Sequence, residues 1–186
     1  SYILSADKDI EGKLSVFVIT YKGTLNEPQI KTEIKTNTIK YQDSDIGVIT
    51  VNANYENNTA DAIVKMQNSD NKGTLTIKGT VPFQNPLSGD TMNAMNISTL
   101  PVDINLKAEN FMLDNFSLLV KDIESLRGVL NADLSAKGTA SDPALTGNLK
   151  ITNGGYLFPL TGMDYSFDAD MSTDNFKLVL NKLKIY

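Results

Sequence analysis

Two clusters of acidic residues are the parts of this sequence whose composition and spacing suggest chemistry. In the first cluster, Asp7, Asp9, Glu11 and Gly12 resemble the opening of a calcium-binding loop, D-x-D-x-D-G. Such a loop needs a bidentate Glu at its twelfth position, and Val18 stands there instead. The residues that follow alternate as a strand does, so we predict no metal site.

The second cluster contains three carboxylates, Asp164, Asp168 and Asp170, which could in principle serve as an acid and a base in glycoside hydrolysis. They alternate with apolar residues, so we predict that they lie on the solvated face of a strand. The chain also has no His and no Cys, which removes the commonest general base, the commonest soft nucleophile and the usual zinc ligands. We therefore predict a protein that is not an enzyme and needs no metal or cofactor.

Composition excludes further classes of function. The 186 residues carry a net charge of only −5, and Lys residues are interspersed with Asp and Glu. Nucleic-acid binding needs a clustered basic surface, so we predict no nucleic-acid partner. No apolar run approaches the roughly 20 residues of a membrane-spanning helix. We expect one elongated, water-soluble domain over residues 1–186, excised from a longer protein because strand-like sequence continues to the C-terminus.

The elements that position these residues are strands with one apolar face, most clearly within Gly128–Gly162. Apolar and polar residues alternate over Leu130–Lys137 and again over Leu145–Ile151. Turn-forming residues separate the two runs at Gly138–Pro143, and Asn153–Gly155 matches a tight hairpin. This stretch therefore predicts an antiparallel meander.

The same alternation extends along the chain and predicts ten to twelve strands. The exceptions are a helix over Asn115–Leu126, with a bent strand as the alternative, and a loop over Pro82–Asn96. The alternation slips at Asn181–Lys182, which predicts a bulge or turn. Burying each large apolar side chain is worth roughly 1.5–3 kcal/mol, so the apolar face must be covered. A second sheet, closure into a barrel, or a curved sheet with an apolar guest would each achieve this.

The chain contains an internal repeat. Gly12–Val18 corresponds to Gly128–Leu134 with one extra residue in the earlier copy, and Pro28 corresponds to Pro143. Later landmarks follow at a constant offset of 115 residues. We therefore predict repeats at about residues 10–125 and 126–186, as in an array whose units cover one another.

The ordered pattern from Gly128 to Gly154, G-x-L-x-A-x-L-x-x-x-G-T-x-x-x-P-x-L-x-G-x-L-x-I-x-x-G, resembles the repeat of TamB-like and AsmA-like bacterial envelope proteins. The similarity extends over residues 126–186. The resemblance implies an all-β fold, an elongated, curved antiparallel sheet (a half-pipe) with a hydrophobic concave face. It also implies a periplasmic segment of a Gram-negative protein anchored in the inner membrane. The implied cargo is phospholipid acyl chains or nascent outer-membrane β-strands, and the implied partner is an outer-membrane assembly barrel of the TamA type.

If the resemblance holds, the inward-facing apolar residues line the path of the cargo. These residues are Leu14, Val16, Val18, Ile34, Ile49, Val51, Leu75, Ile77, Val102, Ile104, Leu106, Leu130, Leu134, Leu145, Leu149, Ile151, Met163, Tyr165, Phe167, Met171, Leu178 and Leu180. The alternative is a structural or adhesive β-sandwich, or a barrel, with a closed core. An enzyme acting on envelope glycans has the least support.

Overall fold

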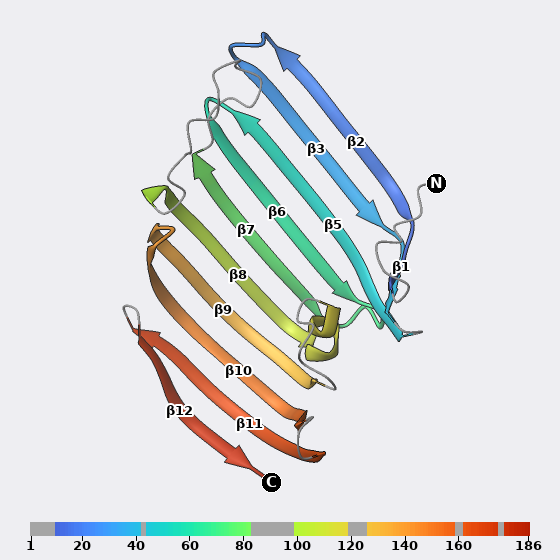
Figure 1. Cartoon of the computed structure of the whole chain (residues 1–186), viewed down its shortest axis with the longest axis vertical. Coiled ribbons are helices and arrows are strands. Elements are labelled where there is room, and N and C mark those ends of the chain that lie inside the picture. Colours follow the sequence, from blue (N-terminus) through green and yellow to red (C-terminus); the bar gives the residue numbers. More distant parts are fainter. Residues whose placement is uncertain (1–9, 42–43, 83–98, 119–125, 159–161, 175–176) are drawn as a thin grey trace.

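The computed structural model describes residues 10–41, 44–82, 99–118, 126–158, 162–174 and 177–186, and it is almost entirely β-strand (Figure 1). The elements are β1 (Ile10–Glu11), β2 (Leu14–Gly23), β3 (Pro28–Thr36), β4 (Ile39–Tyr41), β5 (Ser44–Glu56), β6 (Thr59–Asn68), β7 (Thr74–Pro82), β8 (Pro101–Met112), the 3-10 helix η2 (Leu113–Leu118), β9 (Arg127–Thr139), β10 (Asp142–Phe158), β11 (Met163–Asp174) and β12 (Lys177–Ile185).

All of these strands belong to one antiparallel sheet. From β5 to β12 each strand pairs with the next one along the chain, while β3 and β4 both pair with β5. Strands β2 and β12 lie at opposite edges, and among the described residues no pairing joins them (Figure 1). The described sheet is thus open. The predicted all-β, antiparallel and unclosed sheet is confirmed, and the sandwich and barrel are not the arrangement observed.

Turns formed by Asn or by Gly–Pro pairs connect several of the strands, and the turn predicted at Gly138–Pro143 is among them. Asn57 and Asn58 both have positive φ (51° and 56°) between β5 and β6. Gly23 pairs with Pro28 in the β2–β3 hairpin, and Gly138 pairs with Pro143 in the β9–β10 hairpin. The two predicted repeats therefore place their Gly–Pro pairs at the same register.

The hairpin predicted at Asn153–Gly155 is wrong. These residues lie inside β10, where the register with β11 shifts between Ile151 and Gly154. Asn153 has φ of 51°, and its N–H donates to Oδ1 of Asp168 over 2.8 Å. A β-bulge uses the same positive φ as a tight turn, so the Asn-Gly pair alone does not distinguish the two.

The helix predicted at Asn115–Leu126 is shorter and tighter where it is described. The 3-10 helix η2 begins at Leu113 and ends at Leu118, while residues 119–125 lie outside the described residues. Apart from Pro82, the predicted loop at Pro82–Asn96 also lies outside the described residues. The same is true of Asp7 and Asp9 of the first acidic cluster.

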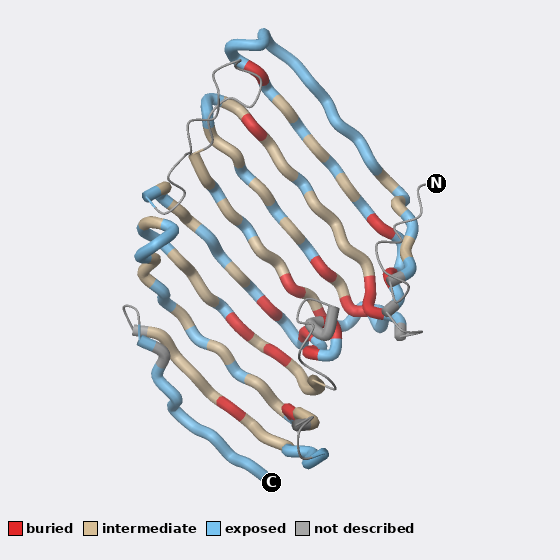
Figure 2. The backbone as a smooth tube through the Cα atoms, viewed as in Figure 1, coloured by how far each residue is buried: buried red, intermediate tan, exposed pale blue. Residues whose placement is uncertain are grey.

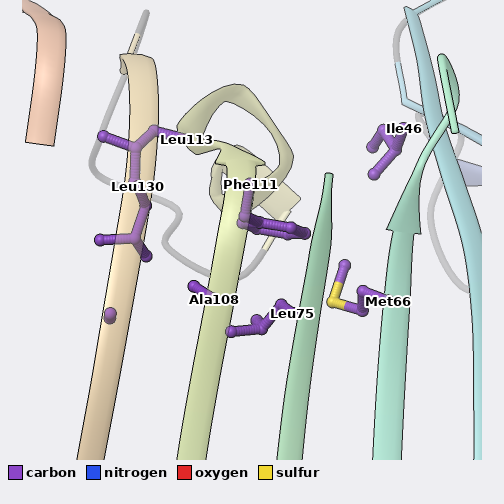
Figure 3. Packing of buried hydrophobic residues seen from close by; sticks show 8 residues of the cluster. Ile46, Met66, Leu75, Ala108, Phe111, Leu113 and Leu130 are labelled. Carbon is purple, nitrogen blue, oxygen red and sulfur yellow. The ribbon is translucent and has the colours of Figure 1, made fainter. Parts of the chain in front are cut away.

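The buried core lies on one face of the sheet, beside η2. Phe111 is 0% exposed and Leu75 is 2% exposed, and both contact a cluster from β5, β6, β8, β9 and η2. Figure 3 shows this cluster at the ends of the strands, with Leu113 of η2 beside Leu130 and Phe111. A single small core at one end leaves most of the sheet uncovered by a second layer of described residues.

Candidate functional site: the apolar face of the sheet

Register places apolar side chains from successive strands in continuous rows. Residues directly opposite one another in an antiparallel pair project on the same side of the sheet. One row crosses the sheet through Phe17, Ile34, Val51, Val64, Ile77, Leu106 and Leu134. A neighbouring row runs through Ile49, Met66, Leu75, Ala108, Ala132, Leu149, Met171 and Leu180. We call this side of the sheet the apolar face.

Most of the residues predicted to line the cargo path lie on the apolar face. They are Leu14, Ile34, Ile49, Val51, Leu75, Ile77, Val102, Ile104, Leu106, Leu130, Leu134, Leu145, Leu149, Ile151, Met163, Tyr165, Phe167, Met171 and Leu180. The backbone of Leu178 pairs with Thr173.

Val16 and Val18 are corrections to this set, because they lie on the opposite face. They pair with Lys35 and Glu33, respectively. The register of β2 shifts between Leu14 and Val16, so Ser15 is an extra residue that inverts the alternation. Three β2 residues that the prediction missed, Phe17, Ile19 and Tyr21, therefore occupy the apolar face instead.

Another bulge occurs in β12, where the slip at Asn181–Lys182 was predicted. Met171 pairs with Leu180, while Asp170 pairs with Lys182, which leaves Asn181 as the extra residue. The predicted bulge is confirmed. Beyond it, Leu183 and Ile185 join the apolar face opposite Ala169 and Phe167.

On β8, exposure along the apolar face increases from Ala108 near η2 toward Ile104. In β8, Ala108 is buried, Leu106 is half-buried, and Ile104 is 37% exposed. Figure 2 shows most of the buried residues gathered near the ends of β5 to β9, with isolated buried residues such as Tyr55 and Ala169 elsewhere in the sheet. Leu145 and Leu180 are 42% and 53% exposed on β10 and β12. Large side chains in such rows form an exposed apolar surface of the kind that marks an interaction site.

A buried hydrogen-bond network around Asn68 attaches η2 to the sheet. Asn68 is the last residue of β6 and is 2% exposed. Its Oδ1 accepts hydrogen bonds from Asn115 Nδ2 (2.9 Å) and Met112 N (3.4 Å), and its Nδ2 donates to the Asn110 carbonyl (3.1 Å). Neither asparagine was predicted from the sequence. Asn68 lies two residues after Met66 in β6, so the alternation places it on the apolar face, where a polar residue is a detectable exception.

The three carboxylates of the second acidic cluster support the sheet. Asp164 accepts a 2.8 Å hydrogen bond from Arg127, with both side chains substantially exposed. Asp168 accepts hydrogen bonds from Tyr186 Oη (2.6 Å) and Asn153 N (2.8 Å), which together lower the pKa of its carboxyl. Asp170 accepts from Asn181 Nδ2 (3.2 Å). Through these partners, β11 is linked to β9, β10 and β12.

Among the residues that the structure describes, no three His, Cys, Asp or Glu side chains are grouped to hold a metal ion. Buried polar side-chain atoms in the same part of the chain all have hydrogen-bond partners. No helix in the described ranges is long and apolar enough to cross a membrane.

The fold and this face define a class: an open antiparallel meander with one polar face and one apolar face that the described residues leave largely uncovered. The model of the TamB C-terminal domain family matches residues 61–168, more than half of the 186 residues and most of the central sheet. The chain therefore belongs to the TamB C-terminal domain family. Its members are TamB-like envelope proteins, transport and assembly components rather than known enzymes, and they work with TamA-type assembly factors. Comparisons with curated proteins and with solved structures gave no match.

Proposed function

We propose that the apolar face carries the acyl chains of phospholipids between the inner and outer membranes, as a non-catalytic segment of a TamB-like protein. The observation that supports this most directly is the continuity of the apolar rows, from Phe17 near one edge to Leu180 at the other. Large side chains such as Ile104, Leu145 and Tyr165 remain more than a third exposed on this face. A lipid chain covering them would remove apolar surface from water at about 25 cal/mol per Å².

The chemistry of the face favours acyl chains over polypeptide strands. Between the two edges, the backbone of each described strand already pairs with neighbours on both sides. The face therefore offers apolar contact and few hydrogen-bonding groups, whereas a bound strand must have its own N–H and C=O groups satisfied. An acyl chain has no such groups, so it fits the face without an unpaired polar atom.

A second candidate function concerns the edge at β12. Among the described strands, β12 pairs only with β11, so its outer side can accept a nascent strand by β-sheet addition. Strand cargo would thus be bound at an edge and acyl chains on the face. These two sites can be tested separately.

We place this activity in the periplasm of a Gram-negative bacterium, in a parent protein anchored in the inner membrane and working with an outer-membrane barrel of the TamA type. Membership of the TamB family supports this arrangement. The polar face, with Lys78, Lys107 and Asp133 at exposed positions, suits the aqueous side of such a span.

Site-specific photocrosslinking in cells tests the proposal. A photoreactive residue at Ile104 should capture phospholipid, while the same residue at Ile63, on the polar face, should not. If a probe placed along β12 captures only polypeptide, the strand-addition function is favoured. Crosslinks from Ile104 and Leu145 that join only parts of the protein itself would contradict lipid binding on the face.

A further inference from the structure

We propose that η2 is a fixed lateral stop that bounds one side of the cargo path on the apolar face, and that Asn68 is the residue that positions it. This inference rests on the proposed acyl-chain function. It adds where on the face the chains lie: across the strands, over the part of the sheet that η2 leaves uncovered.

The position of η2 supports this role. It contacts β9 and β5, so it extends over the ends of the intervening strands (Figure 1). Its Leu113 is buried in the same cluster as Phe111, Leu75 and Leu130 (Figure 3). Within the described residues it is the one element outside the sheet that packs on this cluster. Apolar surface beneath it is therefore already covered by the chain itself.

Asn68 joins this helix to the sheet by three hydrogen bonds from one side chain. Its amide reaches η2 through Asn115 and the strand leading into η2 through Met112 and Asn110. Its backbone N–H also donates to the Gly73 carbonyl over 2.9 Å, which closes the β6–β7 turn. One residue thus fixes both the turn and the helix.

The surroundings of Asn68 leave it little freedom. A Cβ at Gly73 would overlap the Asn68 amide and the Asn110 carbonyl. Asn110 has φ of 48° at the bulge of β8, and its N–H donates to Oδ1 of Asn131 over 3.0 Å. Displacing η2 would break the buried hydrogen bond between Asn115 and Asn68, and a buried polar group left without its partner is unfavourable. The hydrogen-bond network around Asn68 is therefore suited to hold η2 in place while cargo passes.

The exposure of the side chains on β7 and β8 indicates which part of the apolar face is open to cargo. On β7 and β8, the residues nearest η2, Leu75 and Ala108, are buried, whereas Ile77 is half-buried and Ile104 is 37% exposed. Cargo would contact Ile104 and Leu145 but stop short of Leu75. The uncovered band runs across the strands, along the direction in which the sheet extends.

Methyl NMR of the 186-residue chain with 16-doxyl-stearic acid tests the inference, because the native apolar side chains remain in place. In the wild-type chain, the spin label should broaden the methyl signals of Ile104 and Leu145 several-fold more than those of Leu75. In Asn115→Ala this difference should shrink as Leu75 and Leu130 become accessible. Asn52→Ala, an exposed asparagine on the polar face, is the control and should keep the wild-type pattern. Should Asn115→Ala not fold, Leu113→Ala opens the cover without altering the asparagine pair.

Each outcome separates the two proposals. Equal broadening of Leu75 and Ile104 in the wild-type chain would overturn the stop and leave acyl binding intact. Broadening of no methyl on the face would overturn both. An unchanged pattern in the folded Asn115→Ala and Leu113→Ala variants would overturn the role of η2 and its positioning by Asn68.

Discussion

Ile63 and Ile104 are similarly exposed, at 41% and 37%, yet they lie on opposite faces of the same sheet. Ile63 pairs with Asn52 and Lys78, whereas Ile104 pairs with Gly79 and Ala136. The two isoleucines therefore form a matched pair for separating the role of the apolar face from the role of surface hydrophobicity in general.

Ile104→Arg should block lipid transport in the parent protein and leave folding intact. A charge on the uncovered face repels acyl chains, while its partial exposure lets the guanidinium reach water. We expect a loss of stability of about 1 kcal/mol or less, typical of surface positions. Ile63→Arg should have a similar thermal midpoint and normal transport. Equal transport by the two variants would argue against cargo on the apolar face.

Asn68→Ala should be among the most destabilising polar substitutions in this chain. It removes the partners of Asn115 Nδ2, Met112 N and the Asn110 carbonyl. Orphaning the buried Asn115 amide costs about 1–3 kcal/mol, and the two lost bonds to Met112 and Asn110, which lie at exposed positions, bring the total toward the upper end of that range. Asn115→Ala should cost about 1–2 kcal/mol, because the other two bonds of Asn68 remain. Urea unfolding measures both, and equal midpoints for the two variants would contradict the ranking.

Acid should weaken the β11–β12 edge through Asp168. The hydrogen bond from Tyr186, followed by that from Asn153 N, lowers the pKa of this carboxyl. Because its pKa is lower folded than unfolded, its contribution is complete above the ordinary Asp pKa of about 3.9 and is lost as pH falls through the lower, folded value. Tyr186→Phe removes the largest cause, so the pKa of Asp168 should rise toward its ordinary value. Carboxyl-carbon NMR titration measures this, and an unchanged pKa would mean that Tyr186 does not hold Asp168 in solution.

Alternation in the sequence predicted the sheet well, because a half-exposed strand records its two faces residue by residue. Leu145, Leu149 and Ile151 therefore appear on the apolar face, where they were expected. The errors at Val16 and Val18 came from one extra residue, Ser15, which reverses the phase of β2. The sequence contains a sign of this extra residue, because Gly12–Gly23 is one residue longer than the corresponding segment Gly128–Gly138. The slip at Asn181–Lys182 in β12 shows that an irregularity in the alternation can predict a bulge.

Long-range polar contacts were not predictable in the same way. Asn68 and Asn115 are 47 residues apart, and only the tertiary arrangement places one amide beside the other. The Asn153–Gly155 error has a different cause, since positive φ serves equally in a bulge and in a turn. Local patterns therefore revealed the faces of the sheet, while the cover at one end of it depends on contacts between distant strands.

Two glycines on the apolar face provide the last prediction. Gly147 has φ of 128°, and a Cβ there would overlap the Asp133 carbonyl of the neighbouring strand. Gly147→Ala should therefore destabilise the sheet by about 1–3 kcal/mol or more, as expected for a side chain forced into a sparsely populated backbone region. A Cβ at Gly79 meets Ile104 Cγ1 at an ordinary 3.6 Å, so Gly79→Ala should be neutral or stabilise by about 0.4–1 kcal/mol by restricting the unfolded chain. Paired urea unfolding curves measure the contrast. Equal stability of the two alanine variants would contradict this prediction. It would show that the β9–β10 backbone relaxes to accept the side chain, so that the close approach at Gly147 does not determine the stability of the sheet.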